Sequence, residues 1–370
     1  MSPRSSILLT ALPRGALKRG AVLDIGGGKM SSSIREDLCR VFEDAADGQQ
    51  PTMPDELLYD DKGLFIWADI IFTPEFYQTA DEAAIFEENS HAIARHIQKG
   101  AVMVDLGAGD MDKVNLLLRE LARQGRETTY LALDISKKSL ASNLAKLHAE
   151  HAGGSVHVAG LWGDFDAGLR HCKSSAAGDD DATPRVFLSL GSVLFNDPWA
   201  KAVASLKRWA ALMRPSDLIL AGMDGHDVRS RKVWDAYHSH PDLFERFFHN
   251  GFDHANKLLG EVVFRPLDWD ICAEVDAAEK RHRFFVRARR DVMLEGDDGG
   301  VLREGVELDW FDAHKRNEVD VRKMCAQAGL EVIASWAKKG SDMRQYLIRL
   351  ETGGEVSSDE NDSGVSVSGT

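Results

Sequence analysis

The chain has 370 residues, of which 44% are apolar, so it can bury a core, and a wholly disordered protein is excluded. Its 45 Lys and Arg are outnumbered by 59 Asp and Glu, and the formal net charge of -14 argues against nucleic acid as its main partner. No apolar run is long enough to span a membrane, and the four cysteines lack metal-ligand spacing, so we expect no membrane partner, no bound metal and a reducing, cytoplasmic location.

The two ends of the chain differ in composition from its middle. Residues 1–20 carry basic residues and no acid, a weak feature of a mitochondrial presequence, but we interpret them as a frayed N-terminus. Residues 1–30 as a whole are expected to form an N-terminal extension. Residues 353–370 are mainly Gly, Ser and acid, a composition typical of a disordered tail. A run of small and acidic residues at 174–184 lies between two apolar stretches and predicts a surface insertion.

The middle of the chain alternates between strand-like and helix-like patterns. Continuous apolar strands separated by helices are typical of a parallel sheet that is covered on both faces. Right-handed crossovers then give a Rossmann-like, doubly wound α/β sheet, which binds ligands beyond the carboxyl ends of its strands. The expected strands are 101–107, 129–135, 185–191 and 217–224, and the expected helices are 113–124, 139–151 and 198–213.

Two glycine-rich turns follow strand-like runs, one within 22–28 and one within 104–110. Only the second is followed by a helix and then by a strand that ends in an acid, Asp134, about twenty-five residues beyond Gly109. Gly107 and Gly109 would let a ligand approach the backbone, and an acid at the end of the next strand accepts both ribose hydroxyls of a nucleoside. We therefore predict a nucleoside site at the second turn, and we interpret the first as an edge strand or turn without a cofactor role.

NAD and S-adenosylmethionine both use such a site, and the start of the following helix distinguishes them. A pyrophosphate needs a helix start that is free of acids, but Asp110 and Asp112 lie there, and the third glycine of the dinucleotide pattern is missing. S-adenosylmethionine has no phosphate, its sulfonium and amino groups tolerate nearby acids, and the backbone or Lys113 could bind its carboxylate. These features favour S-adenosylmethionine as the cofactor.

A third part of the cofactor site is predicted after the strand-like run at 156–162. Asp164 could accept the adenine amino group, and Phe165 could stack on the adenine ring. The alternative role for Asp164 is a helix N-cap.

These stretches resemble the family of histidine-specific (ergothioneine-pathway) S-adenosylmethionine-dependent methyltransferases, in particular its fungal branch, which includes dimethylallyltryptophan N-methyltransferase. The resemblance covers residues 55–350, and Met-Asp-Lys-Val at 111–114 is especially similar to the fungal members. The matching stretches are LYDDKG (58–63), TPEFYQT (73–79), DLGAG (105–109), ALD (132–134), GDF (163–165), GSVLFN (191–196), DAY (235–237) and RARR (287–290).

The resemblance implies roles for individual residues of this chain. Asn196 and Tyr237 would hold the amino and carboxylate ends of an amino acid, and Phe76 and Tyr77 would line the substrate cavity. From the residues alone, a turn residue is an equal alternative for Asn196, which follows a strand end, and packing is an equal alternative for Tyr237 on its helix. The predicted cofactor-binding residues are Tyr59, Gly107, Gly109, Lys113, Asp134, Asp164 and Phe165.

The resemblance also implies two domains, with the amino acid bound between them. The Rossmann-like, S-adenosylmethionine-binding domain would comprise residues 101–224 and a returning segment at 321–352. A second, smaller α+β substrate domain would comprise residues 31–100 and an insertion at 225–320.

The sequence departs from the family where the histidine enzymes use a Glu and a Ser to bind the imidazole. Phe311 aligns with the Glu and Ala313 with the Ser, whereas a slip of one residue would place Trp310 or Asp312 there. Neither register restores the imidazole contacts, and a polar ring edge without partners costs about 1–3 kcal/mol per group. We therefore expect that histidine is not the substrate.

We thus expect a monomeric N-methyltransferase of secondary metabolism, in particular alkaloid formation, that acts on the α-amino group of a small, amino-acid-like molecule. Phe76, Phe284 and Phe311 would shape a cavity for a mostly apolar, tryptophan- or tyrosine-like side chain. Methyl transfer depends mainly on proximity and orientation, and no catalytic residue is assigned. The alternatives are an L-histidine Nα-methyltransferase, a NAD-dependent oxidoreductase and a non-catalytic protein with a cofactor fold.

Overall fold

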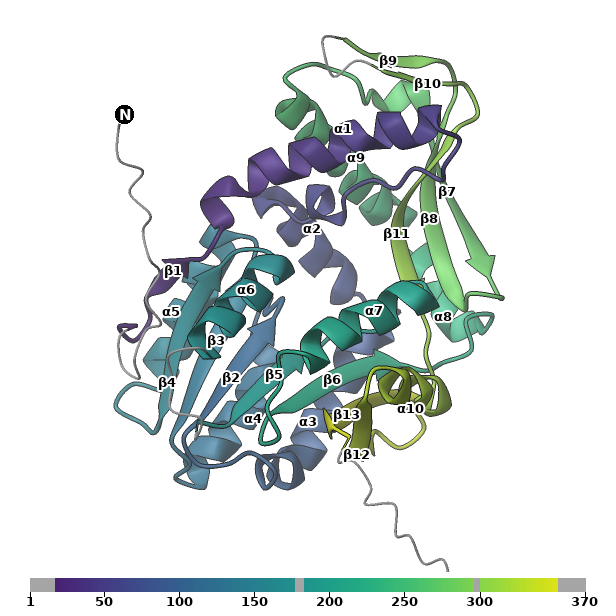
Figure 1. Ribbon diagram of the computed structural model, residues 1–370. Coiled ribbons are helices and arrows are strands. Elements are labelled where there is room, and N and C mark those ends of the chain that lie inside the picture. Colours follow the sequence, from purple (N-terminus) through teal and green to yellow (C-terminus); the bar gives the residue numbers. More distant parts are fainter. Residues whose placement is uncertain (1–16, 177–182, 296–299, 352–370) are drawn as a thin grey trace, which may run out of the picture.

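The computed structural model describes residues 17–176, 183–295 and 300–351. The predicted tail at 353–370 and part of the predicted insertion at 174–184 lie outside these ranges. The described chain forms a large sheet with helices on both faces and a smaller part built on a three-stranded sheet (Figure 1). None of the helices in the described ranges is both long and apolar enough to cross a membrane.

The large sheet has eight strands in the order β1-β4-β3-β2-β5-β6-β13-β12. Neighbours from β1 to β6 are parallel, whereas β13 is antiparallel to both β6 and β12. From β2 the chain first adds strands on one side and then returns to add β5 on the other. The order therefore reverses between β2 and β5, which is where such sheets bind ligands. The strands are Val22–Asp24, Ala101–Leu106, Thr128–Asp134, Val156–Trp162, Arg185–Ser189 and Leu218–Asp224 for β1 to β6, with Leu330–Ala337 for β12 and Met343–Leu350 for β13.

Helices cover both faces of this sheet, which explains why its strands are continuous apolar runs. Their apolar faces and the two sheet faces form two separate clusters of buried side chains. This architecture confirms the predicted Rossmann-like, doubly wound α/β fold. One face carries α3 (Tyr77–Ala94), α4 (Asp112–Arg123) and α5 (Lys137–Glu150), and the other carries α6 (Phe165–Ala176), α7 (Trp199–Ala210) and α10 (Glu318–Gln327).

Two segments pair or pack differently from the predicted division of the chain. The segment 31–100 was expected in the substrate domain, but α3 packs on the larger sheet because Phe86 and Ile93 are fully buried in its core. We propose that the substrate-domain segment ends near residue 76. Strand β1 precedes the first glycine turn and pairs with β4 at the edge of the large sheet. Of the two interpretations of this segment, an edge strand or a turn, the structure shows the edge strand.

The smaller part is the antiparallel sheet β11-β8-β7, and helices cover one of its faces (Figure 1). Its strands are β7 (Trp269–Asp276), β8 (Arg281–Ala288) and β11 (Glu307–His314), beside the hairpin β9 (Val292–Leu294) and β10 (Gly300–Leu302). The helices are α1 (Met30–Ala46), α2 (Asp61–Ile71), α8 (Arg231–His238) and α9 (Pro241–Leu259), with short 3-10 turns η1 (Gly27–Lys29), η2 (Asp55–Leu58) and η3 (Pro266–Asp268).

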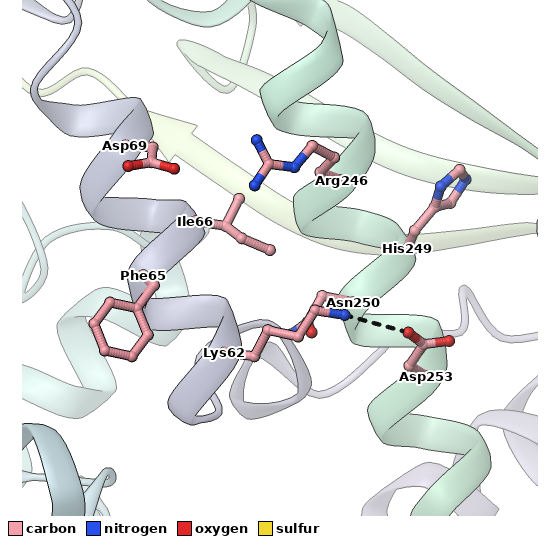
Figure 2. Close-up of a pocket in the computed structure, with 8 residues that line it drawn as sticks. All are labelled: Lys62, Phe65, Ile66, Asp69, Arg246, His249, Asn250 and Asp253. Atoms are coloured by element: carbon pink, nitrogen blue, oxygen red, sulfur yellow. Dashed lines mark ion pairs between the residues drawn. The ribbon is translucent and has the colours of Figure 1, made fainter.

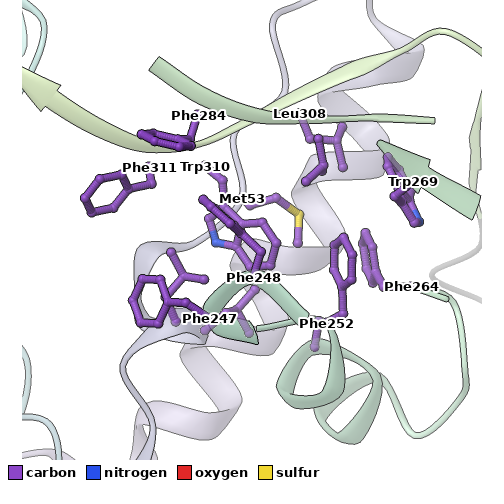
Figure 3. Packing of buried hydrophobic residues seen from close by; sticks show 14 of the residues in the cluster. Met53, Phe247, Phe248, Phe252, Phe264, Trp269, Phe284, Leu308, Trp310 and Phe311 are labelled. Atoms are coloured by element: carbon purple, nitrogen blue, oxygen red, sulfur yellow. The ribbon is translucent and has the colours of Figure 1, made fainter. Parts of the chain in front are cut away.

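Aromatic rings fill the core between these helices and strands (Figure 3). Phe252 of α9 stacks on Phe264 with ring centroids 5.7 Å apart, and Phe264 stacks on Trp269 of β7 at 5.4 Å. Each such pair contributes about 0.5–1.5 kcal/mol beyond the burial of its area. Packed aromatic side chains therefore stabilise the smaller part of the protein.

Two fully buried histidines make the stability of this core depend on pH. Burial is the main cause that lowers the pKa of His282 to about 4 and that of His314 to about 3. Below pH 6.5 the unfolded chain protonates these rings while the folded chain does not, so the folded state loses stability as pH falls from 6.5 to about 4. Each ring should contribute a slope of up to about 1.4 kcal/mol per pH unit.

Urea unfolding of the wild type and of His282→Gln at several pH values between 7 and 4 measures this contribution. We expect the variant to show a smaller loss of stability across this interval, because one group that binds a proton only on unfolding is gone. Equal slopes in the two proteins would contradict the prediction.

Candidate functional site

The predicted cofactor turn lies at the carboxyl end of β2 and is held by the end of β3. Gly107 and Gly109 adopt positive φ angles of 75° and 57°, which favour glycine. The N–H groups of Gly107 and Ala108 both donate to the carbonyl of Leu133 at 3.0 Å, and the Gly109 N–H donates to Asp134 Oδ2 at 3.1 Å. The structure thus brings together the two glycines and the acid that the sequence predicted to form one site.

Asp134 is almost fully buried at this junction. Burial raises the pKa of its carboxyl group, and the N–H groups of Ser136 and Gly109 that donate to it limit the rise. The carboxylate therefore shapes the turn and also ends β3, the neighbour of β2, where a ribose would approach.

Phe165 and Asp164 lie on the other side of the same turn. The ring of Phe165 is 46% exposed, and its nearest atom is 3.5 Å from the place where a side chain on Gly107 would begin. The exposed part of this side chain could stack on a flat ligand, and the positive φ of Gly107 is what favours glycine beside it. Asp164 Oδ1 accepts the Ala167 N–H at 2.6 Å, so this oxygen caps the N-terminus of α6, which is the alternative role that the sequence left open.

Lys113 points to a buried carboxylate that the sequence analysis did not single out. Its ammonium lies 2.5 Å from Oε2 of Glu82, which belongs to α3. Glu82 also accepts the Gly191 N–H at 3.0 Å and a Gln345 amide hydrogen at 2.6 Å. Burial alone would lower the pKa of Lys113, but the charge of Glu82 raises it above its ordinary value, so the side chain stays cationic.

Glu82 therefore joins both sides of the switch point, because Lys113 follows β2 and Gly191 follows β5. A Cβ on Gly222 of β6 would lie 2.1 Å from Glu82 Oε1, so this strand needs glycine to make room for the carboxylate. In the sequence Glu82 is one of several acids between residues 75 and 88, and only the packing shows that it is buried.

Tyr59 lies at the edge of the aromatic core, where η2 meets α2. Its ring packs edge-on against Trp67 at 5.8 Å and Phe247 at 5.5 Å between centroids. The start of α2 reaches the cofactor side as well, since Ser136 Oγ donates to Asp61 Oδ1 at 2.6 Å. Tyr59 is thus placed where the smaller part meets the larger sheet.

The predicted substrate-side rings surround Tyr237 of α8. Its ring centroid lies 5.8 Å from Phe76, 6.1 Å from Phe284 and 6.4 Å from Phe311, and Figure 3 shows the last two beside each other. Tyr77 is also buried, but its hydroxyl donates to Asp224 Oδ2 at 2.5 Å. The structure therefore gathers these residues at one place.

A β-bulge decides which residues of β11 face these rings. The pairing with β8 shifts between Asp309 and Phe311, so two adjacent residues, Trp310 and Phe311, are both buried. Phe311 packs beside Tyr237, whereas Asp312 pairs with Arg281 at 2.5 Å. The structure thus places Phe311 beside Tyr237, and its alignment with the Glu of the histidine enzymes stays a prediction. Ala313 is buried two residues further along β11.

Asn196 connects the two parts of the protein. Its Nδ2 donates to the carbonyl of Asp312 at 2.8 Å, and its Oδ1 accepts the His314 N–H at 2.7 Å. A side-chain amide has two N–H donors and two acceptor lone pairs, so one of each remains for a ligand. Asn196, which is predicted to bind the amino-acid head group, therefore also connects the loop after β5 to strand β11.

The end of β6 holds a second group of buried charges, in which Asp224 is the residue that the sequence did not mark. Asp224 accepts hydrogen bonds from Tyr77 at 2.5 Å and from the backbone of His226 at 3.1 Å, and it pairs with Lys315 at 3.0 Å. Lys315 Nζ also donates to the hydroxyl of Tyr237 at 2.9 Å. Apart from the neighbours Asp224 and His226, these residues lie far apart in the sequence, in α3, in α8 and after β11.

A surface hollow of about 310 Å³ lies between α2 and α9 (Figure 2). An ion pair between Lys62 of α2 and Asp253 of α9 connects the two helices, with the charged atoms 3.5 Å apart. None of the predicted site residues lines the hollow, so we place the functional site at the carboxyl edge of the large sheet instead. The lining residues are Lys62, Phe65, Ile66, Asp69, Arg246, His249, Asn250 and Asp253.

Comparison with known proteins assigns a family to this arrangement. Residues 34–350 match the model of a family described as histidine-specific methyltransferase, SAM-dependent. The chain is 29% identical over 318 residues to ergothioneine biosynthesis protein 1 of Neurospora crassa, which covers 85% of this chain and 35% of that protein. The chain therefore spans about a third of the length of this relative.

Two other relatives are similar over more of their own length. N-methyltransferase imqF of Aspergillus flavus is 27% identical over 290 residues, or 77% of each chain. The 4-dimethylallyltryptophan N-methyltransferase easF of Trichophyton verrucosum is 28% identical over 347 residues, which cover 90% of this chain and 98% of that protein. Among solved structures, the 1,6-didemethyltoxoflavin-N1-methyltransferase of Burkholderia thailandensis covers 88% of this chain and 91% of its own at 13% identity, with a TM-score of 0.35.

Proposed function

Since the chain belongs to the family of S-adenosylmethionine-dependent, histidine-specific methyltransferases, we propose that it methylates the α-amino nitrogen of an amino acid other than histidine, with a large apolar side chain. The enzyme is an S-adenosylmethionine-dependent N-methyltransferase. The proposed substrates are tryptophan- or tyrosine-like compounds, including modified ones, and the proposed setting is secondary metabolism. A relative named for 4-dimethylallyltryptophan supports an indole-like substrate.

The position of Phe311 carries this proposal. The family resemblance implies a Glu at this position and a Ser two residues later in enzymes that bind imidazole. In this chain an aromatic ring and the methyl group of Ala313 are buried there, beside Tyr237. An imidazole would lose its water without gaining a partner, whereas an apolar ring would gain about 25 cal/mol for each Å² that it buries.

The residues at the switch point fit S-adenosylmethionine. The exposed ring of Phe165 offers a stacking surface for a flat base beside Gly107, and the carboxylate of Asp134 lies at the end of the adjacent strand. When bound, the cofactor supplies an electrophilic methyl group on a sulfonium ion. We propose that Asn196 and Tyr237 orient the amine for in-line attack, so that position rather than acid–base chemistry supplies most of the rate.

Mass spectrometry of an amino-acid pool incubated with enzyme and S-adenosylmethionine tests the proposal. We expect tryptophan, tyrosine or their prenylated derivatives to gain the mass of one to three methyl groups. Histidine alone gaining methyl groups efficiently would instead identify the enzyme as an L-histidine Nα-methyltransferase and refute the proposed substrate class.

The double variant Phe311→Glu with Ala313→Ser introduces the two residues that the histidine enzymes are expected to carry at these positions, and so tests their role in substrate choice. We expect it to reduce turnover of the aromatic substrate by at least tenfold, because a carboxylate replaces an apolar wall, and to increase histidine methylation. The measured quantity is the ratio of kcat/KM for the two substrates. The matched control is Asp312→Asn, which changes the intervening residue that pairs with Arg281 and should leave the ratio within twofold. A double variant with the wild-type ratio would contradict the assignment.

A further inference from the structure

Lys315 and Asp224 form a buried ion pair behind the predicted substrate site. The side chain of Lys315 is 2% exposed, that of Asp224 is fully buried, and the charged atoms lie 3.0 Å apart. A buried pair of this kind costs desolvation energy that its attraction only partly repays, so it is weak evidence for a stabilising role. The pair also contacts the hydroxyl of Tyr237, a predicted substrate-binding residue.

Both groups remain charged in this environment. Burial alone would raise the pKa of Asp224, but the ammonium of Lys315 and the contacts with His226 and Tyr77 hold it well below its ordinary value. Burial alone would lower the pKa of Lys315, but the charge of Asp224 and the hydroxyl of Tyr237 raise it. The pair thus places a fixed positive charge next to Tyr237.

The hydroxyl of Tyr237 has both of its acceptor positions occupied. Lys315 Nζ donates to it at 2.9 Å, and Gln78 Nε2 donates to it at 2.8 Å. A phenol oxygen has two lone pairs and one hydrogen, so only the hydrogen is left to bind a further group. Among the residues that the structure describes, no acceptor for this hydrogen is found, although the tyrosine itself is buried.

We infer that Lys315, held in place by Asp224, is a positioning residue that fixes the hydrogen of Tyr237 as a donor to the carboxylate of the substrate. This inference rests on the proposed function, in which Tyr237 binds the amino-acid head group. Because the hydroxyl of Tyr237 accepts a hydrogen bond from the Lys315 ammonium, its own O–H is polarised and donates more strongly. The acceptor that best matches such a donor is a negatively charged group such as a carboxylate. An amide in place of the carboxylate accepts more weakly, and a decarboxylated amine leaves the hydrogen unpaired.

The experiment compares an aromatic amino acid with its carboxamide as substrates of the full-length enzyme. Whichever amino acid is turned over best serves as the acid, with L-tryptophan and L-tryptophanamide as the first pair. We expect wild-type kcat/KM to be about 10- to 100-fold higher for the acid, the size of a charge-assisted hydrogen bond. Lys315→Met should abolish most of this preference through a higher KM for the acid, with little change for the amide.

Lys315→Met leaves Asp224 without its cation, so a charge-neutral variant keeps the test decisive. Lys315→Met with Asp224→Asn removes both charges and should show the same loss of acid preference with a melting temperature nearer to that of the wild type. Lys62→Met removes an exposed lysine that pairs with Asp253 and should leave the preference unchanged.

A double-mutant cycle separates positioning from structure. If Lys315 acts through Tyr237, then Lys315→Met should cause little further loss of acid preference in a Tyr237→Phe background. Equal losses for acid and amide, or losses that add fully to those of Tyr237→Phe, would overturn the inference. Failure of the proposed function looks different, because then neither compound would be methylated by the wild-type enzyme.

Discussion

Replacing Glu82 with alanine should lower the free energy of unfolding by about 3–5 kcal/mol, the loss observed when one partner of a buried ion pair is removed. Glu82 is almost fully buried, and its carboxylate receives hydrogen bonds from Lys113, Gly191 and Gln345. Without it, the ammonium of Lys113 and two further donors would lose their acceptor, and a cavity would open beside Gly222. Urea unfolding followed by circular dichroism measures the change.

Two variants of the same helix serve as controls. Glu82→Gln keeps the shape and one acceptor oxygen but not the charge, so its loss should be smaller than that of alanine. Glu87→Ala removes an exposed acid from α3 and should change stability by less than about 0.5 kcal/mol. If Glu82→Ala behaved like Glu87→Ala, the carboxylate would not join the two sides of the switch point.

The sequence was sufficient to predict the sheet and the cofactor turn because both depend on neighbours along the chain. Each central strand is a short apolar run, and Asp134 follows the glycine turn by one helix and one strand, which is the connection that makes β2 and β3 adjacent. The sequence predicted that residues 321–352 return to the large domain, but it did not predict the two strands β12 and β13 within them. The antiparallel pairing of β13 with β6 depends on contacts across more than a hundred residues of sequence.

The buried charges could not be predicted in the same way. Glu82, Asp224 and Lys315 are ordinary polar residues in the sequence, and their role depends on segments that only the fold brings together. The side chain of Asn196 was predicted to bind a ligand, but its contacts with the backbone of β11 depend on how the smaller part docks on the sheet. Likewise, the bulge after Asp309 sets the register of Phe311, and no feature of the sequence marks it.

Asp134→Ala should weaken the binding of S-adenosylmethionine by about 1.5–3 kcal/mol, or about 10- to 150-fold in Kd, the usual contribution of hydrogen bonds to a charged group. The carboxylate lies at the end of β3, next to β2, and by our interpretation it accepts the ribose hydroxyls. It also receives the N–H groups of Gly109 and Ser136, so part of the loss would come from a loosened turn. Isothermal titration calorimetry with the cofactor measures the change, and Asp134→Asn, which keeps one acceptor oxygen, should lose less.

Asp24 offers a matched control within the same sheet. It ends β1 as Asp134 ends β3, and it receives the N–H groups of Gly26 and Gly28 at 2.9 Å and 3.3 Å in the first glycine turn. The two acids therefore share strand position and turn chemistry, but only Asp134 lies beside the switch point between β2 and β5. We expect Asp24→Ala to leave cofactor affinity within twofold. Asp24 is exposed whereas Asp134 is buried, so a loss of affinity equal to that of Asp134→Ala would show that the first turn also contributes to the cofactor site.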